Sequence, residues 1–400
     1  MKKILIVGAG VEQVPAIKIA REFGHYTIVT DISEKAPGIN YANKNYIVST
    51  NDPEGNLKIA EKEQIDGVMT LCSETAVPVI AYVSAQLGLP GMSEHTALAA
   101  TNKGVMRNEL SKRDVSLTGY AIIDNYDDLI KFTNLHNPPW VIKPSDSSGQ
   151  RGISLIHGKK ELKESYYEAK KFATDGNVIV EEFARGPEIN VTCLVIDGEV
   201  HVLSLSDRIT LPTPHFGIAN MHLAPPALEK HEIGAIKEQA IEATKAIGLK
   251  NGISYPQFIA SEEGPKLLEI AARIPGGNMR EVAMYLSGID MIKTTIRQSL
   301  GEKINYKDSI TEEIHPALAI RFITSLDIRH GNKKVESITG IEEVSKLPGI
   351  KFCDIRLKKG DIPPQLSNSG GRFGSFCAVG NSRDEVLKIT DAAYKKINIQ

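Results

Sequence analysis

Residues 267–277 of this 400-residue chain read Leu-Leu-Glu-Ile-Ala-Ala-Arg-Ile-Pro-Gly-Gly, an apolar strand that carries one carboxylate and one arginine. Side chains on a strand alternate between its two faces, so Glu269, Ala271 and Arg273 are predicted to share one face. Such a pair suits a metal–phosphate site, because Mg²⁺ prefers oxygen ligands and arginine stabilises developing negative charge. The two glycines precede a predicted helix whose N-terminus, together with Arg280, offers a further place for an anion.

Two stretches upstream extend this pattern. The apolar strand Trp140–Lys143 ends in a lysine and is soon followed by the small-residue loop SSGQRG at 147–152. Backbone N–H groups of such a loop can surround phosphate oxygens while the lysine supplies the opposite charge. A second strand, VIVEEF at 178–183, carries two adjacent acids and precedes Glu188. Taken alone, the loop fits a surface hairpin better than a phosphate site, and it lacks the Walker sequence G-x-x-x-x-G-K-[ST].

The rest of the chain indicates the fold class. The first hundred residues alternate short β-branched strands with helical segments, which predicts a parallel α/β sheet. Residues 101–305 mix strands and helices, including a hairpin turn at Asp197-Gly198, while Leu211–Pro226 is predicted to be an ordered, proline-rich loop. Residues 306–400 have an α+β pattern. We therefore expect three parts, at about 1–100, 101–305 and 306–400.

The first strand ends in the turn Gly8-Ala9-Gly10, and Asp31 ends the second strand, as in dinucleotide-binding domains. The third glycine of G-x-G-x-x-G would fall at position 13, which is Gln13. The fingerprint is therefore incomplete, and we interpret the turn as a fold-forming element that can line a substrate pocket. An oxidoreductase using this turn is the weaker alternative.

Composition excludes several classes of protein. With 47 basic and 49 acidic side chains neither sign dominates, so we expect no nucleic-acid or membrane partner. The four cysteines show no C-x-x-C pair, which argues against a zinc site or a disulfide framework. The N-terminus lacks a signal-peptide pattern, so we expect a cytoplasmic protein. Neither G-x-S-x-G nor H-E-x-x-H is present, which leaves a hydrolase without a nominated nucleophile.

The four motifs V-I-K-P, S-S-G-Q-R-G, V-E-E-F-x-x-G-x-E and L-E-I-x-A-R-x-x-G-G occur in that order along the chain. In this order they resemble the ATP-grasp superfamily, in particular the carboxylate–amine ligases related to amino-acid ligases, biotin carboxylase and purine-pathway synthetases. The resemblance implies a Rossmann-like parallel-sheet domain at 1–100 and a two-lobed ATP-grasp module at 101–305. That module would divide into a lid subdomain at 101–184 and a large subdomain at 185–305. A C-terminal α+β cap at 306–400 would complete the chain.

The resemblance also implies roles for individual residues. The ATP-binding set comprises Lys103, Lys143, Ser147, Ser148, Gly149, Gly152, Glu181, Glu182, Phe183 and Glu188. Lysines and the glycine loop would contact phosphates, the acids at 181 and 182 with Phe183 would hold adenine, and Glu188 would bind ribose. Glu269 and Gln257 would hold Mg²⁺, or Mn²⁺ in its place. Arg273 and Lys143 would act on the transferring phosphoryl group and the substrate carboxylate.

Substrate contacts are predicted from five further side chains, namely Glu74, Arg208, His215, Arg280 and Arg372. Four of these have a plainer interpretation as well. Glu74 fits the acidic first turn of a helix, Arg208 fits an ion pair with Asp207, and a histidine in a loop, such as His215 or His222, is more often simply exposed. Arg372 adjoins a glycine-rich turn, where an arginine need have no ligand.

Two positions depart from the family pattern. Gln257 stands where a first metal-binding glutamate is usual, and Ala271 replaces an asparagine ligand. The prediction is an ATP- and Mg-dependent ligase that joins a small-molecule carboxylate to an amine or ammonia through an acyl phosphate. A ligase like biotin carboxylase or the purine synthetases, with a different nucleophile, stays open, as does an ATP-binding regulator without ligase activity. A homodimer is what the resemblance suggests.

Overall fold

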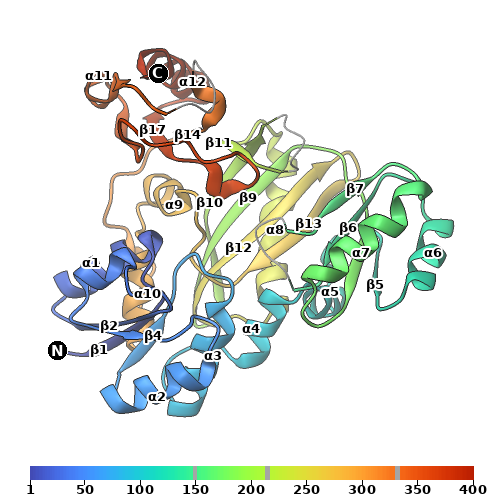
Figure 1. The fold of residues 1–400 in the computed structure, drawn as a ribbon, viewed down its shortest axis with the longest axis horizontal. Helices are drawn as coiled ribbons and strands as arrows, with labels where there is room; N and C mark the ends of the chain where they lie inside the picture. The colour runs from blue at the N-terminus through green and yellow to red at the C-terminus, as the bar shows by residue number, and fades with distance from the viewer. Residues whose placement is uncertain (147–150, 212–216, 329–333) are drawn as a thin grey trace.

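The computed structural model describes residues 1–146, 151–211, 217–328 and 334–400. The predicted site residues Ser147, Ser148, Gly149 and His215 lie outside these described residues. Figure 1 shows the chain running from an N-terminal sheet through a large central sheet, with a smaller sheet to one side and the C-terminal elements above. In the described parts of the chain no helix is long and apolar enough to span a bilayer.

The N-terminal sheet is parallel, and its strand order is β3-β2-β1-β4. Its strands are β1 (Lys3–Val7), β2 (Tyr26–Asp31), β3 (Lys44–Ile47) and β4 (Gly67–Met69), and its helices are α1 (Val14–Glu22), α2 (Pro53–Glu63) and α3 (Ala76–Leu87). The central strands are buried and almost continuously apolar, as expected where helices cover both faces of a sheet. The predicted α/β parallel sheet is confirmed.

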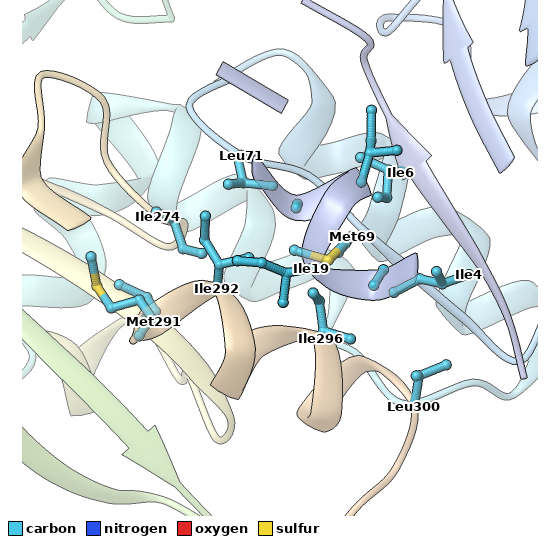
Figure 2. Packing of buried hydrophobic residues seen from close by; sticks show 14 of the residues in the cluster. Ile4, Ile6, Ile19, Met69, Leu71, Ile274, Met291, Ile292, Ile296 and Leu300 are labelled. Atoms are coloured by element: carbon cyan, nitrogen blue, oxygen red, sulfur yellow. The ribbon is translucent and has the colours of Figure 1, made fainter. Parts of the chain in front are cut away.

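One face of this sheet is covered by helices from two distant parts of the chain. Figure 2 shows Ile4 and Ile6 of β1 packed in one cluster with Ile292 and Ile296 of α10 (Met291–Ser299). Burial of each such side chain contributes about 1.5–3 kcal/mol. The N-terminal sheet is therefore fixed to the central part of the chain by a shared core.

The smaller sheet is antiparallel, with strand order β5-β8-β6-β7. It comprises β5 (Tyr120–Ile123), β6 (Trp140–Pro144), β7 (Ser154–Ile156) and β8 (Val178–Glu182), with α6 (Tyr126–Leu135) and α7 (Leu162–Phe172). Trp140, the sole tryptophan of the chain, lies at 1% exposure in its core. Helices α4 (Glu94–Thr101) and α5 (Lys103–Ser111) lead into this sheet from the N-terminal part.

The large sheet has eight antiparallel strands in the order β13-β12-β9-β10-β11-β14-β17-β16. They are β9 (Glu188–Ile196), β10 (Glu199–Thr210), β11 (Ala219–Ala224), β12 (Gly252–Ser261), β13 (Gly264–Ala271), β14 (Ala317–Ile323), β16 (Ile350–Ile355) and β17 (Gly374–Gly380). Strand β11 pairs with β14, so one continuous sheet crosses the boundary that we placed near residue 305. The predicted hairpin at Asp197-Gly198 is confirmed, with positive φ at both residues.

Strand β11 corrects one prediction, because it lies inside Leu211–Pro226, which we expected to be a loop. The prolines of that stretch flank Ala219–Ala224 and none lies within it, so the strand keeps every N–H that the ladder needs. The remaining elements are α8 (Lys230–Ala246), α9 (Met279–Ser287), α11 (Ile341–Ser345), α12 (Arg383–Lys396), β15 (Ile338–Thr339) and β18 (Asn398–Ile399).

The glycine turn after β1 is closed by its own side chains. Asp31 accepts a hydrogen bond from the Ala9 N–H at 2.8 Å, and Gln13 Nε2 donates to the Leu71 carbonyl at 2.6 Å. A Cβ at Gly8, where φ is +101°, would lie 3.2 Å from Gln13 Cδ. Gln13 therefore occupies the space above the turn, which supports a structural interpretation of this segment.

Candidate active site

A cavity of about 140 Å³ lies between the small sheet and the large sheet. It is lined by nine of the predicted site residues, namely Lys103, Lys143, Glu181, Glu182, Phe183, Glu188, Arg208, Gln257 and Glu269. They come from α5, β6, β8, β9, β10, β12 and β13 and from the segment that follows β8, elements far apart in sequence. The fold thus brings the sequence motifs to one place.

Lys103 is the first residue of α5, after the N-cap Asn102. The Asn102 side chain accepts from the Val105 N–H at 3.0 Å, which satisfies one of the free donors of the first helical turn. The Lys103 N–H itself donates to the Ser145 carbonyl at 2.7 Å, just beyond β6. A lysine at the positive end of a helix dipole, facing a cavity, is well placed to contact anions.

Glu181 lies at the centre of a buried charge cluster. Its carboxylate is 2.6 Å from Lys143 Nζ and 2.5 Å from Arg107 Nη2, and all three side chains are almost fully buried. Burial alone would raise the pKa of Glu181, but the charges of Arg107 and Lys143 outweigh it and lower the pKa to about 2. Glu181 is therefore ionised and positions Lys143 beside the cavity.

Glu182, the next residue on β8, directs its carboxylate elsewhere. It accepts from the Gly119 N–H at 3.1 Å and lies 2.8 Å from His136 Nδ1. Adjacent residues of a strand face opposite ways, which explains the different partners of the two acids. A contact between Glu182 and adenine would therefore come from its main chain.

Glu188 pairs with Arg208 across β9 and β10, at 2.5 Å. The alternative partner that we weighed for Arg208, Asp207, faces the other side of the sheet and pairs with Arg383 at 2.7 Å. Arg208 thus belongs to the cavity wall together with Glu188.

Gln257 and Glu269 are direct partners on β12 and β13, beside a bulge. In the described part of the chain the Glu269 carboxylate makes no hydrogen bond or ion pair, so its oxygens are available to a cation. Gln257 Nε2 donates to Asn190 Oδ1 at 2.9 Å, which leaves the Gln257 carbonyl oxygen for the cavity. Among the described residues no group of three or more His, Cys, Asp or Glu side chains could hold a metal ion alone. Two oxygen donors at one cavity fit Mg²⁺, which usually keeps phosphate and water ligands.

A second cavity, of about 100 Å³, continues from Gln257 and Glu269 to Ala271, Arg273 and Glu74. Glu269, Ala271 and Arg273, which we expected to share one face, thus line one cavity together with Ile270, and Arg273 lies two residues beyond the end of β13. Arg273 donates to Glu74 through Nε at 2.7 Å, and its Nη2 lies 2.6 Å from the same carboxylate oxygen. Glu74, from the N-terminal part of the chain, thus fixes the guanidinium of Arg273 in this second cavity.

A third cavity, of about 400 Å³, lies between the glycine turn, the start of α9 and the C-terminal strands. Arg280 lines it and is held by two hydrogen bonds, of 3.0 and 2.5 Å, to the buried Asp290. Arg372 stacks on Phe322 at 4.1 Å, and in the residues that the structure describes it has no carboxylate partner. Burial and the charge of Arg208 lower the pKa of Arg372 to about 10, so an anion in this cavity would relieve an uncompensated charge.

Sequence reasoning overlooked Arg107 and Asn190, and left His222 as an exposed loop residue. Arg107 follows Lys103 by four residues in α5, and this spacing on one helical face was an available signal. Asn190 and His222 are buried, at 0% and 3% exposure; only the strand register places Asn190 opposite Gln257, and Asn190 in turn contacts His222. Gly152, predicted to belong to the phosphate loop, lies outside all three cavities, whereas its neighbour Ile153 lines the first.

Comparisons with known proteins agree with this geometry. The family described as carbamoyl-phosphate synthase L chain, ATP binding domain, matches residues 102–307, and L-amino acid ligase C-terminal domain 2 matches residues 334–400. A formate-dependent phosphoribosylglycinamide formyltransferase of Histophilus somni is 23% identical, over 100% of this chain and 96% of its own.

Two solved structures share the fold. An L-amino acid ligase from Bacillus licheniformis aligns with a TM-score of 0.82 at 22% identity, over 100% of this chain and 98% of its own. A phosphoribosylglycinamide synthetase from Anaerococcus prevotii also has a TM-score of 0.82, at 21% identity, over 100% of this chain and 99% of its own. At these identities the structural likeness shows the arrangement of the chain and leaves the substrates open.

Proposed function

Since the chain belongs to the carbamoyl-phosphate synthase L chain ATP-binding family, within the ATP-grasp superfamily, we propose that it joins a small-molecule carboxylate to an amine at the expense of ATP. The resemblance to ATP-grasp ligases that the four motifs indicated is thereby confirmed. The observation that carries the proposal is the cavity lined by nine of the predicted site residues, with Lys103 and Lys143 near the acid Glu269.

In the proposed reaction a carboxylate oxygen attacks the γ-phosphorus of ATP, and the bond from that phosphorus to the bridging oxygen breaks to release ADP. The amine nitrogen then attacks the acyl carbon of the acyl phosphate, phosphate leaves, and the nitrogen loses a proton. Mg²⁺, when bound at Glu269 and Gln257, would neutralise phosphate charge. Lys103, Lys143 and Arg273 supply positive charge, and the protein contributes chiefly by positioning the reactants.

The third cavity is where we propose that the carboxylate substrate binds, beyond the ATP phosphates. It begins just beyond the end of β13, at Ile274, and its lining includes Arg280 and Arg372 together with Glu12 and Glu281. Groups of both signs suit a zwitterion such as an amino acid, and the C-terminal match to an L-amino acid ligase domain favours the same class. Purine intermediates or bicarbonate are the alternatives that a substrate panel separates.

The test is release of ADP and phosphate from Mg-ATP across a panel of carboxylates, with and without amino-acid amines. Release that requires both partners is the expected result. Lys143→Ala and Glu269→Ala should each abolish it, while Lys131→Ala, on the exposed face of α6, should retain it. Full activity in either of the first two variants would refute these residue assignments.

A second candidate function rests on Gln257 and Ala271, which replace two ligands usual in the family. A site with fewer charged metal ligands fits an ATP-binding regulator that joins nothing. Calorimetric ATP binding without turnover on any carboxylate–amine pair would favour this second candidate.

A further inference from the structure

A row of polar side chains continues from the proposed metal site into the core of the large sheet. Glu269, Gln257 and Asn190 are register partners on β13, β12 and β9, and His222 lies on β11, beyond the intervening strand β10. Gln257 Nε2 donates to Asn190 Oδ1 at 2.9 Å, and Asn190 Nδ2 lies 3.1 Å from His222 Nδ1. Asn190 and His222 are buried, and most buried side-chain donors meet an acceptor within the protein.

The orientation of the Asn190 amide is fixed by a third neighbour. Asn190 Nδ2 also lies 3.9 Å from the sulfur of Met279, which can accept but not donate. Its two N–H groups therefore have two acceptors, and its oxygen has the Gln257 donor. If the amide were turned over, its oxygen would face the Met279 sulfur, and a hydrogen bond to Gln257 would require the glutamine oxygen to point inward.

This arrangement determines the proton position on His222. Asn190 donates to Nδ1, so Nδ1 is unprotonated and the single proton of the neutral ring is on Nε2. Burial, with the charges of Arg208 and Arg372, lowers the pKa of His222 well below its usual range, which keeps the ring neutral. Nε2 lies on the side of the third cavity, where a Cβ at Gly277 would be 3.6 Å away.

We infer that Asn190 and His222 are positioning residues for the metal site, because Asn190, held by Met279 and by the Nε2–H form of His222, keeps the Gln257 carbonyl oxygen towards Glu269. With the opposite tautomer Gln257 would present its NH₂ group, which repels a cation. The inference rests on the proposed function for its purpose, yet it concerns metal binding and proton position, which are measured without turnover.

The first experiment records long-range ¹H–¹⁵N spectra of the chain labelled with ¹⁵N-histidine, which distinguish the two tautomers of a neutral ring. His222→Gln identifies the signal by its loss. We expect the Nε2–H form in the wild type and the Nδ1–H form in Gln257→Glu. A carboxylate at 257 can only accept, so Asn190 must turn and its oxygen then needs a proton from His222.

The second experiment measures Mn²⁺ affinity by electron paramagnetic resonance with a non-hydrolysable ATP analogue. Asn190→Leu should weaken Mn²⁺ binding about 10–100-fold, the usual effect of removing an outer-sphere partner. Thr192→Val is the matched control, because Thr192 lies on the same strand and face, is buried, and has a hydroxyl without a hydrogen-bond partner. Its Mn²⁺ affinity should equal that of the wild type.

Either of two results overturns the inference: a wild-type His222 in the Nδ1–H form, or Asn190→Leu binding Mn²⁺ as tightly as Thr192→Val. The spectra of the unmodified chain decide the first point even if Asn190→Leu does not fold. If the expected tautomers and affinities are found but no substrate pair is ligated, the positioning role stands and the ligase proposal fails. If a substrate pair is ligated but His222 is in the Nδ1–H form, the ligase proposal stands and the positioning role fails.

Discussion

Arg107→Met should destabilise the part of the chain that encloses the cavity. The Arg107 side chain, at 1% exposure, makes two hydrogen bonds to the Glu181 carboxylate, of 3.0 and 2.5 Å. It also donates to the carbonyls of Leu267 and Leu268 on β13, at 3.0 and 2.8 Å. One side chain thus joins the small sheet to the large sheet beside Glu269.

The magnitude follows from what the substitution leaves behind. Methionine fills much of the volume, but Glu181 keeps only Lys143, and the buried carbonyl of Leu267 and the partly buried carbonyl of Leu268 each lose a donor. Removing one partner of a buried ion pair costs about 3–5 kcal/mol, and each unsatisfied carbonyl costs about 1–3 kcal/mol. These penalties overlap because neighbouring groups relax together, so we expect a loss of about 4 kcal/mol in the free energy of unfolding.

Urea unfolding followed by fluorescence measures this loss, because the sole tryptophan, Trp140, is buried in the same sheet as Glu181. Arg113→Met is the control: Arg113 follows α5 and makes an exposed ion pair with Glu242 at 3.3 Å. An exposed pair contributes less than about 1 kcal/mol. The reasoning is refuted if Arg107→Met lowers stability no more than Arg113→Met.

Two further predictions concern acid stability and the third cavity. The pKa of Glu181 falls from its ordinary 4.5 to about 2 on folding, so its contribution of about 3 kcal/mol is present above pH 4.5 and is lost as the pH falls towards 2. Urea unfolding midpoints, followed by Trp140 fluorescence at a series of pH values, should show this dependence, and Glu181→Gln should flatten it. Equal pH profiles for the wild type and Glu181→Gln would contradict the prediction. Gly277→Ala places a Cβ 3.4 Å from Arg372 Nη2 at φ +68°, so the KM of the carboxylate substrate should rise while ATP affinity stays unchanged. Gly264→Ala imposes positive-φ strain with no atom within 4 Å, and a similar rise there would show that strain alone is responsible.

Much of the candidate site was predictable because its residues lie at the ends of short strands. Strand alternation placed Glu269 and Arg273 on one face, and both line the second cavity. The motif order placed Lys143, Glu181 and Glu188 together, and all three line the first cavity. Local pattern sufficed in these cases, because the chemistry of each motif belongs to a single strand and its adjoining loop.

The parts that sequence could not supply depend on register between distant strands. Asn190 is 67 residues from Gln257 and 32 from His222, and no local pattern relates the three. Nor does the proline-rich composition around β11 reveal that Ala219–Ala224 links the central strands to β14. Buried polar contacts of this kind arise from pairing order, which a single sequence does not display.

The two cations that we assign to catalysis are held in different ways, and the difference predicts which of them moves. Lys143 shares the Glu181 carboxylate with Arg107, so Lys143 can turn towards a phosphate while Glu181 stays paired. Glu74 has Arg273 as its one ion-pair partner among the described residues, and moving Arg273 would leave a partly buried carboxylate uncompensated. Arg273 should therefore keep Nε and Nη2 on Glu74 and offer Nη1 to an incoming anion. Nucleotide binding should then adjust Lys143 against a fixed Arg273, and the carboxylate end of the proposed site should be set before ATP arrives.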